Sequence, residues 1–126
     1  MARVTGIGGI FLKARDPKTL AAWYALHLSC PLADWGGITF RWSEDPLASA
    51  GSTTLAFFPA ESKHFPNPAM INFRVDDLEK LLTQLRAANV TIDPKRDSDP
   101  HGLFAWITDP EGNRIELWQP LVPEAS

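Results

Sequence analysis

Two stretches of the chain, residues 9–14 and 70–75, show the alternation of side chains that is typical of a β-strand. Every second residue in them is apolar: Ile10, Leu12 and Ala14 in the first stretch, and Ile71, Phe73 and Val75 in the second. Successive side chains of a strand point to opposite faces, so we expect these apolar sets to pack against a helix. The remaining residues of each stretch are mixed, which indicates a face partly open to solvent or ligand.

A helix is predicted after each of these strands. Asp16 followed by Pro17 is typical of an N-cap with proline in the first helical position, and Asp76 or Asp77 can cap the second helix, which is expected to end near Asn89. Apolar residues recur at helical spacing in both segments: Leu20, Trp23, Tyr24 and Leu28, then Leu78, Leu81, Leu82 and Leu85. We interpret these stripes as core.

Further strands are expected after each helix, at residues 38–42 and 53–58 in the first half and at 90–92, 103–108 and 114–119 in the second. Residues 109–113 are mostly turn formers, so the last two strands are predicted to form a hairpin with a loop of about five residues. In the last strand, Ile115 and Leu117 are predicted to point to one face, and Arg114, Glu116 and Trp118 to the other.

The two halves are related by an internal repeat with an offset of 61 positions. Residues 9–16 align with residues 70–77, and Gly51 and Pro59 align with Gly112 and Pro120. Each half is too small to bury its apolar face alone, so the pair is predicted to share one core. The sequence thus predicts an α+β domain with module 1 at about residues 5–59, a proline-rich linker at about 59–69, module 2 at about 70–120 and a tail at 121–126.

Composition limits the classes of function. The chain has 126 residues, of which 44% are hydrophobic, as expected for one packed domain. Its net charge of -3 argues against nucleic acid or an anionic membrane as a partner. No apolar run approaches a membrane span, and the beginning lacks the hydrophobic block of a signal peptide, so a cytoplasmic location is expected. Cys30 is the only cysteine, and we interpret it as a small buried residue rather than a nucleophile.

The repeated modules, the ending Asp-Pro-Glu-Gly-Asn-Arg-Ile-Glu-Leu at 109–117 and the segment Phe-Arg-Val-Asp-Asp-Leu at 73–78 resemble the vicinal oxygen chelate superfamily. This superfamily includes glyoxalase I, the bleomycin-resistance proteins and the extradiol dioxygenases. The resemblance extends from about residue 7 to residue 120. It implies two βαβββ modules with curved mixed sheets that form an open cup, and a homodimer, but it does not imply one particular reaction.

The resemblance also implies positions for a divalent metal, which catalytic members hold with four side chains, two from each module. Carried over to this chain, these positions are Gly9, Leu55, Met70 and Glu116, and only Glu116 offers a suitable ligand. One carboxylate is too few for a catalytic metal, which usually needs about three protein ligands. We therefore predict no metal and no other cofactor, with a divalent metal as the alternative.

Glu116 itself has three possible roles. It is a candidate general base for an acidic C–H of a substrate, or an acceptor in a binding cup where Lys13, Arg41 or Arg74 offsets its charge. The third possibility is an ion pair with Arg114 or another cation at the edge of the sheet.

Aromatic residues suggest what surrounds this carboxylate. If Thr108 faces Arg114 across the hairpin, Trp106 lies beside Glu116. The candidate ligand-binding residues are Phe11, Lys13, Arg41, Trp42, Asn72, Arg74, His101, Trp106 and Trp118. His27 is interpreted as a surface or helix-end residue, and His64 and His101 as exposed loop residues, although His101 is placed where it can reach a ligand.

These observations favour a metal-free cup that binds a small aromatic or amphipathic molecule. A metal-dependent lyase, isomerase or dioxygenase of the glyoxalase I type with an atypical site is one alternative, and a non-catalytic scaffold or interaction protein is another. The sequence leaves open whether the protein is an enzyme and whether the modules pair within one chain or between two.

Overall fold

The protein is an α+β domain in which two helices and a small 3-10 turn accompany one open sheet. The computed structural model describes residues 2–3, 5–47 and 51–121, so the predicted tail lies outside the described residues except for Leu121. The elements in chain order are α1 (Pro17–Leu28), η1 (Trp42–Glu44), β1 (Ile71–Arg74), α2 (Leu78–Ala87), β2 (Thr91–Asp99), β3 (Gly102–Thr108) and β4 (Arg114–Pro120). None of the helices in these ranges is long and apolar enough to cross a membrane.

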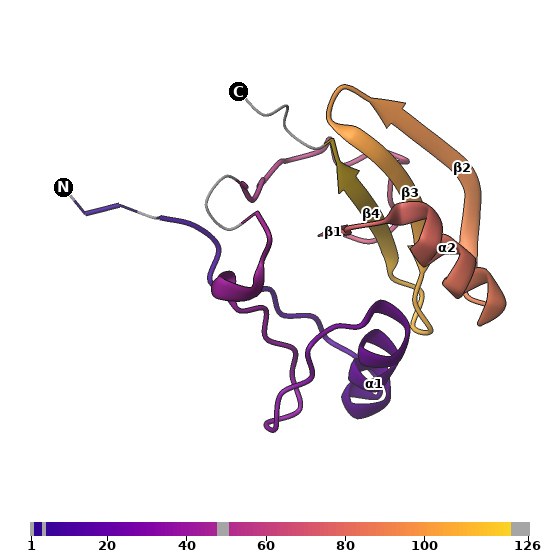
Figure 1. The fold of residues 1–126 in the computed structure, drawn as a ribbon. Coiled ribbons are helices and arrows are strands. Elements are labelled where there is room, and N and C mark those ends of the chain that lie inside the picture. Colours follow the sequence, from indigo (N-terminus) through magenta and orange to yellow (C-terminus); the bar gives the residue numbers. More distant parts are fainter. Residues whose placement is uncertain (1, 4, 48–50, 122–126) are drawn as a thin grey trace.

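The sheet belongs entirely to the second half of the chain. Its strand order is β1-β4-β3-β2, in which β1 runs parallel to β4 and the other pairs are antiparallel. Figure 1 shows α2 across one face of this sheet and α1 near the end at which the β3–β4 turn lies. Thr108 pairs with Arg114, so the turn consists of residues 109–113 and the predicted five-residue hairpin loop is confirmed.

The core lies between the helices and one face of the sheet. Leu78, Leu82 and Leu85 of α2 and Leu20 and Tyr24 of α1 are buried there, as their helical spacing predicts. The sheet contributes Ala105, Ile107, Ile115 and Leu117. The predicted alternation along β4 is therefore confirmed, with Ile115 and Leu117 facing the helices.

Both helices begin at the predicted caps. The carboxylate of Asp16 accepts a hydrogen bond from the backbone N–H of Thr19 at 3.1 Å, with Pro17 as the first helical residue. Asp77, rather than Asp76, caps α2 by accepting from the backbone N–H of Lys80 at 3.1 Å. These contacts satisfy donors that the first turn of a helix leaves without a partner.

The strands predicted for the first half are the main error of the sequence analysis. Residues 9–14 and 53–58 form no strand, and residues 38–42 contribute only an isolated bridge from Ile38 to Leu32. Ile10 is 59% exposed, and of the apolar set in residues 9–14 only Ala14 packs against the core cluster. Alternation makes a segment suited to a sheet, but a strand forms only where a neighbouring strand supplies hydrogen bonds.

The strand predicted at residues 90–92 is longer than expected. β2 continues to Asp99 through Pro94, and its pairing with β3 shifts between Ile92 and Arg96. Proline has no N–H to donate to a ladder, so its presence at such an irregularity is expected.

Candidate functional site

The candidate site is the face of the sheet that points away from the helices. Its residues, which we call the site face, come from alternate positions of three neighbouring strands: Asn72 and Arg74 of β1, Arg114, Glu116 and Trp118 of β4, and Phe104 and Trp106 of β3. The register pairs Glu116 with Asn72 on one side and with Trp106 on the other. Trp106 thus lies beside Glu116, as the hairpin predicted.

Glu116 has two polar neighbours. The side-chain amide of Asn72 donates a hydrogen bond to its Oε2 at 2.9 Å, and Nε2 of His64 lies 3.5 Å from its Oε1. The pairing of Asn72 with Glu116 follows from the strand register. The carboxylate is therefore held in place by an amide and an imidazole, and its remaining acceptor capacity is available to a further donor.

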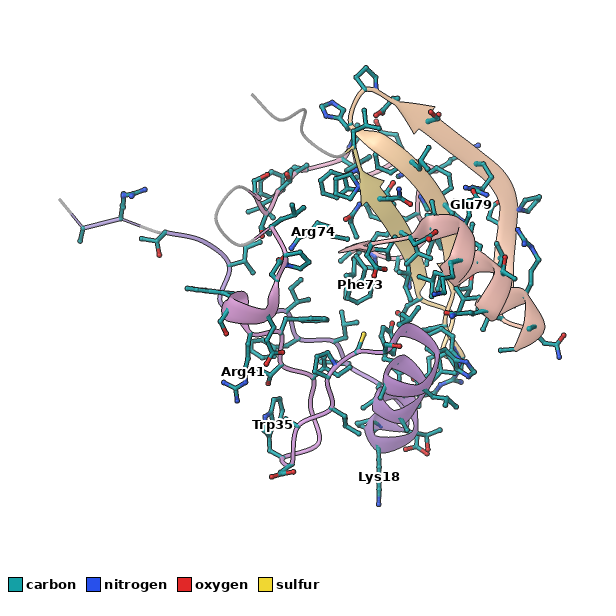
Figure 2. All side chains as sticks on the ribbon, in the orientation of Figure 1. Lys18, Trp35, Arg41, Phe73, Arg74 and Glu79 are labelled. Carbon is teal, nitrogen blue, oxygen red and sulfur yellow. The ribbon has the colours of Figure 1, made fainter. Side chains whose placement is uncertain are left out.

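The cations considered as partners of Glu116 lie elsewhere. Arg114 donates to Asp93 at 2.9 Å, so Arg114 is not the cation that pairs with Glu116. Arg74 projects from β1 and pairs with Asp45, which follows η1 (Figure 2). Each of these two arginines pairs with a carboxylate from outside the site face.

His64 is not the exposed loop residue that the sequence suggested. Its side chain is only 27% exposed, and its ring stacks on Phe58 with centroids 5.5 Å apart and planes inclined by 3°. It also meets Trp106 edge to face at 5.7 Å and Phe65 at 6.1 Å. The linker therefore crosses the site face and lays aromatic rings beside Glu116. No local pattern signals this, since it depends on the path of the linker.

A second pair of rings lies farther along the same face. Phe104 and Trp118 are cross-strand partners whose rings stack with centroids 6.4 Å apart and planes inclined by 12°. The indole N–H of Trp118 donates to the backbone carbonyl of His101 at 3.0 Å. Both residues are half-buried, so this stack is partly exposed to solvent on the site face.

Four predicted ligand-binding residues are not brought to this face. Phe11, Lys13, Arg41 and Trp42 are exposed residues of the first half, and Figure 2 shows Arg41 on a loop away from the sheet. They were expected in the cup because residues 9–14 and 38–42 were expected to be strands. The side chain of His101 is also exposed, in the turn between β2 and β3.

Cys30 is buried, as expected, and burial raises the pKa of its thiol to about 11. We expect the folded protein to react with a disulfide reagent at about pH 8 at least about 100-fold more slowly than the protein in guanidinium chloride, because only the thiolate attacks. Absorbance of the released thiol measures both rates. Equal rates would show that this thiol is accessible in the folded state.

Comparison with known protein families decides the family. The model of the Glyoxalase/Bleomycin resistance protein/Dioxygenase superfamily matches residues 6–117. The chain belongs to this superfamily. No curated protein matches it at a significant level.

Solved structures support the glyoxalase fold. The antibiotic binding protein TnmS3 from Streptomyces sp. CB03234 matches with a TM-score of 0.63 and 22% identity, over 96% of this chain and 100% of that one. The oxidase ChaP-H2 matches at 0.55 and 19%, over 90% and 91% of the two chains. Lactoylglutathione lyase from Agrobacterium tumefaciens matches at 0.51 and 18%, over 91% and 96%. At identities this low, the similarity of these structures shows a shared fold and nothing more.

The donor set of this glyoxalase-superfamily chain does not fit the metal site of catalytic members. Of the four positions that the resemblance implies, Gly9 and Leu55 lie in the unpaired segments of the first half and Met70 directly precedes β1. Glu116 and His64 are two ligands at most. Within the described ranges, no group of three or more His, Cys, Asp or Glu side chains is arranged to hold a metal ion.

Proposed function

We propose that this protein binds a small aromatic or amphipathic molecule on the site face without a metal ion. The observation that carries the proposal is the partly exposed stack of Phe104 on Trp118 on the same face as Glu116. Flat rings offer a large apolar contact area, and a neighbouring carboxylate accepts a hydrogen bond from a ligand hydroxyl or amine. A net charge of -3 is too small to favour a polycationic ligand.

The comparisons supply limited further support. TnmS3 is described as an antibiotic binding protein, which fits a binding role for a chain of this fold. The lyase and the oxidase among the similar structures represent the enzymatic alternative. We favour binding because only Glu116 remains of the four implied ligand positions. Protein purified without chelator is accordingly expected to contain well below one equivalent of transition metal.

We also propose that the protein is a homodimer. The unpaired segments of the first half carry exposed apolar side chains, among them Phe11, Leu55 and Phe57. Exposed apolar surface of this kind is typical of an interaction site, and β1 is an edge strand with one side unoccupied by the other strands of the sheet. A second copy of the chain would cover these groups.

Binding on the site face predicts a matched pair of variants. We expect 2-acetylnaphthalene to quench intrinsic tryptophan fluorescence saturably, and Trp118→Leu to weaken its affinity about 10-fold, because the aromatic platform is lost. Trp35→Leu is the control, since Trp35 lies on the exposed loop of the first half, away from the sheet (Figure 2). If both variants bind as tightly as the unaltered protein, the site face is not the binding surface.

One observation favours a second function. The rings of His64 and Phe65 in the linker, with Phe58 just before it, already occupy part of the site face. If the protein is a scaffold without a ligand, these rings cover the site face permanently. We would then expect none of a panel of planar aromatic compounds to change the tryptophan fluorescence, and this result would rule out the binding function.

A further inference from the structure

Two buried hydrogen-bond donors on the site face have no acceptor. The indole Nε1 of Trp106 and the guanidinium Nε of Arg114 are both buried, and neither has a partner among the residues that the structure describes. Trp106 as a whole is only 2% exposed. A buried donor left without a partner costs about 1–3 kcal/mol, so two of them in one place call for an explanation.

The two side chains are neighbours. Trp106 is opposite Glu116 in the β3–β4 register, and Arg114 is two residues before Glu116 on the same face. The guanidinium carbon of Arg114 lies 5.4 Å from the centroid of the Trp106 ring, and Nζ of Lys95 lies 5.2 Å from it. The hydrogen bond from Arg114 to Asp93 fixes the guanidinium, so its free Nε–H is held at a defined position.

The surrounding charges favour an acceptor at this point. Lys95 and Arg114 bring positive charge to the Trp106 ring, and Asp93 offsets the charge of Arg114. Glu116, the nearby carboxylate of the site face, is engaged by Asn72 and His64. An oxygen with a partial or full negative charge is the kind of atom that each free donor requires, whereas another donor would satisfy neither.

We propose that Trp106 and Arg114 form a subsite for an oxygen acceptor of the bound molecule, which is therefore an aromatic carbonyl or carboxylate compound. This inference rests on the proposed function and narrows its ligand class. The aromatic part of the ligand lies along the site face toward the Phe104–Trp118 stack, and its oxygen accepts from the indole N–H and the guanidinium N–H.

Access to the subsite requires the linker to move. The ring of His64 stands edge-on to Trp106 and is itself stacked on Phe58, which is exposed. His64 and Phe58 belong to no helix or strand, so their displacement breaks no sheet hydrogen bonds. His64 contacts both the Trp106 ring and the carboxylate of Glu116, so a ligand that displaces His64 takes over its place beside both groups.

The test compares two probes of the same shape. 2-Acetylnaphthalene carries a carbonyl oxygen, and 2-isopropenylnaphthalene has a methylene group in its place. We expect the ketone to bind about 10-fold more tightly, which corresponds to about one hydrogen bond to a buried donor. With ¹⁵N-labelled protein, we expect the indole N–H cross-peak of Trp106 to move downfield when the ketone is added. The same cross-peak is expected to keep its position when the hydrocarbon is added.

The five tryptophan side chains give five indole cross-peaks. Phenylalanine substitutions at Trp23, Trp35, Trp42 and Trp118 assign four of them, so Trp106 is identified even if its own replacement prevents folding. Arg114→Lys keeps a cation beside Asp93 but lacks the Nε–H, and it is expected to reduce the preference for the ketone to about 3-fold. 2-Naphthoate distinguishes an anionic acceptor from a neutral one.

The outcomes separate the inference from the function on which it rests. Equal affinity of ketone and hydrocarbon, with an unmoved Trp106 cross-peak and binding that still depends on Trp118, would overturn the acceptor subsite and leave the binding function intact. If neither probe binds in a Trp118-dependent way, the proposed function itself fails. A preference for ketone or naphthoate together with a shifted Trp106 cross-peak supports the subsite.

Discussion

Replacing Asp109 with alanine is expected to lower the free energy of unfolding by about 3 kcal/mol, because several buried hydrogen bonds lose their common acceptor. Asp109 is buried and accepts from the hydroxyl of Tyr24 at 2.7 Å and from the backbone N–H groups of Glu111 and Asn113 at 2.8 and 3.0 Å. The side-chain amide of Asn113 donates to it as well, at 2.7 Å. Urea denaturation of variant and parent measures the difference.

The large effect is expected because this one carboxylate joins the two halves of the chain. Tyr24 belongs to α1 of the first half, and burial, reinforced by Asp109, raises the pKa of its hydroxyl far above the usual value. The hydroxyl therefore stays a donor throughout the physiological range. Glu111, in the same loop, accepts from the backbone N–H groups of Arg15 and Asp16 at the start of α1.

Tyr24→Phe is the matched control, since it removes one of these hydrogen bonds and keeps the ring against Phe73. We expect it to cost about 1 kcal/mol. If Asp109→Ala costs no more than Tyr24→Phe, the loop does not depend on the Asp109 carboxylate, and the halves are linked by the Glu111 hydrogen bonds and apolar packing instead.

This loop also shows what a sequence can predict. The turn residues at 109–113, the helix caps Asp16 and Asp77, and the position of Trp106 beside Glu116 follow from rules that operate over a few residues. The apolar stripes of the helices follow from periodicity, and so do Ile115 and Leu117. In each case the information that determines the geometry lies in the segment itself.

The partners of Glu116, in contrast, could not be predicted from the sequence. The imidazole of His64 comes from the linker, and Asp93 and Asp45 take the arginines that were expected near Glu116. These contacts depend on the path of the chain between elements, about which neither spacing nor composition is informative. The sequence indicates only that Glu116 has a partner, because a carboxylate among large apolar residues needs a compensating group.

The first half poses a different problem, because its pattern is correct and its strands still do not form. Residues 53–58 align with β4 in the internal repeat, yet they pair with no strand, and Leu55 and Phe57 are 71% and 89% exposed. Local alternation specifies a strand only together with a partner. A second copy of the chain, bringing its own unpaired segments and the free edge of its β1, offers that partner with the same sequence pattern.

Substituting aspartate at both Leu55 and Phe57 is accordingly expected to raise the dimer dissociation constant at least about 100-fold. Alternate side chains of an extended segment lie on one side, so both residues face the same partner surface. Burying each apolar side chain contributes about 1.5–3 kcal/mol, and a two-fold interface uses both residues twice, so 100-fold, or about 2.7 kcal/mol, is a lower bound.

Sedimentation equilibrium measures this directly, because the unaltered protein is expected at twice the chain mass of 14.0 kDa and the variant at the chain mass itself. Leu26→Asp serves as the control, since Leu26 is an equally exposed apolar residue on α1 rather than on an unpaired segment. A dimer that survives the double substitution would place the interface elsewhere, and an unaltered protein that sediments as a monomer would refute the dimer. If the double variant alone dissociates, the unpaired segments of the first half are the elements through which two copies meet, and the strand pattern at residues 53–58 is explained by a neighbour in another chain.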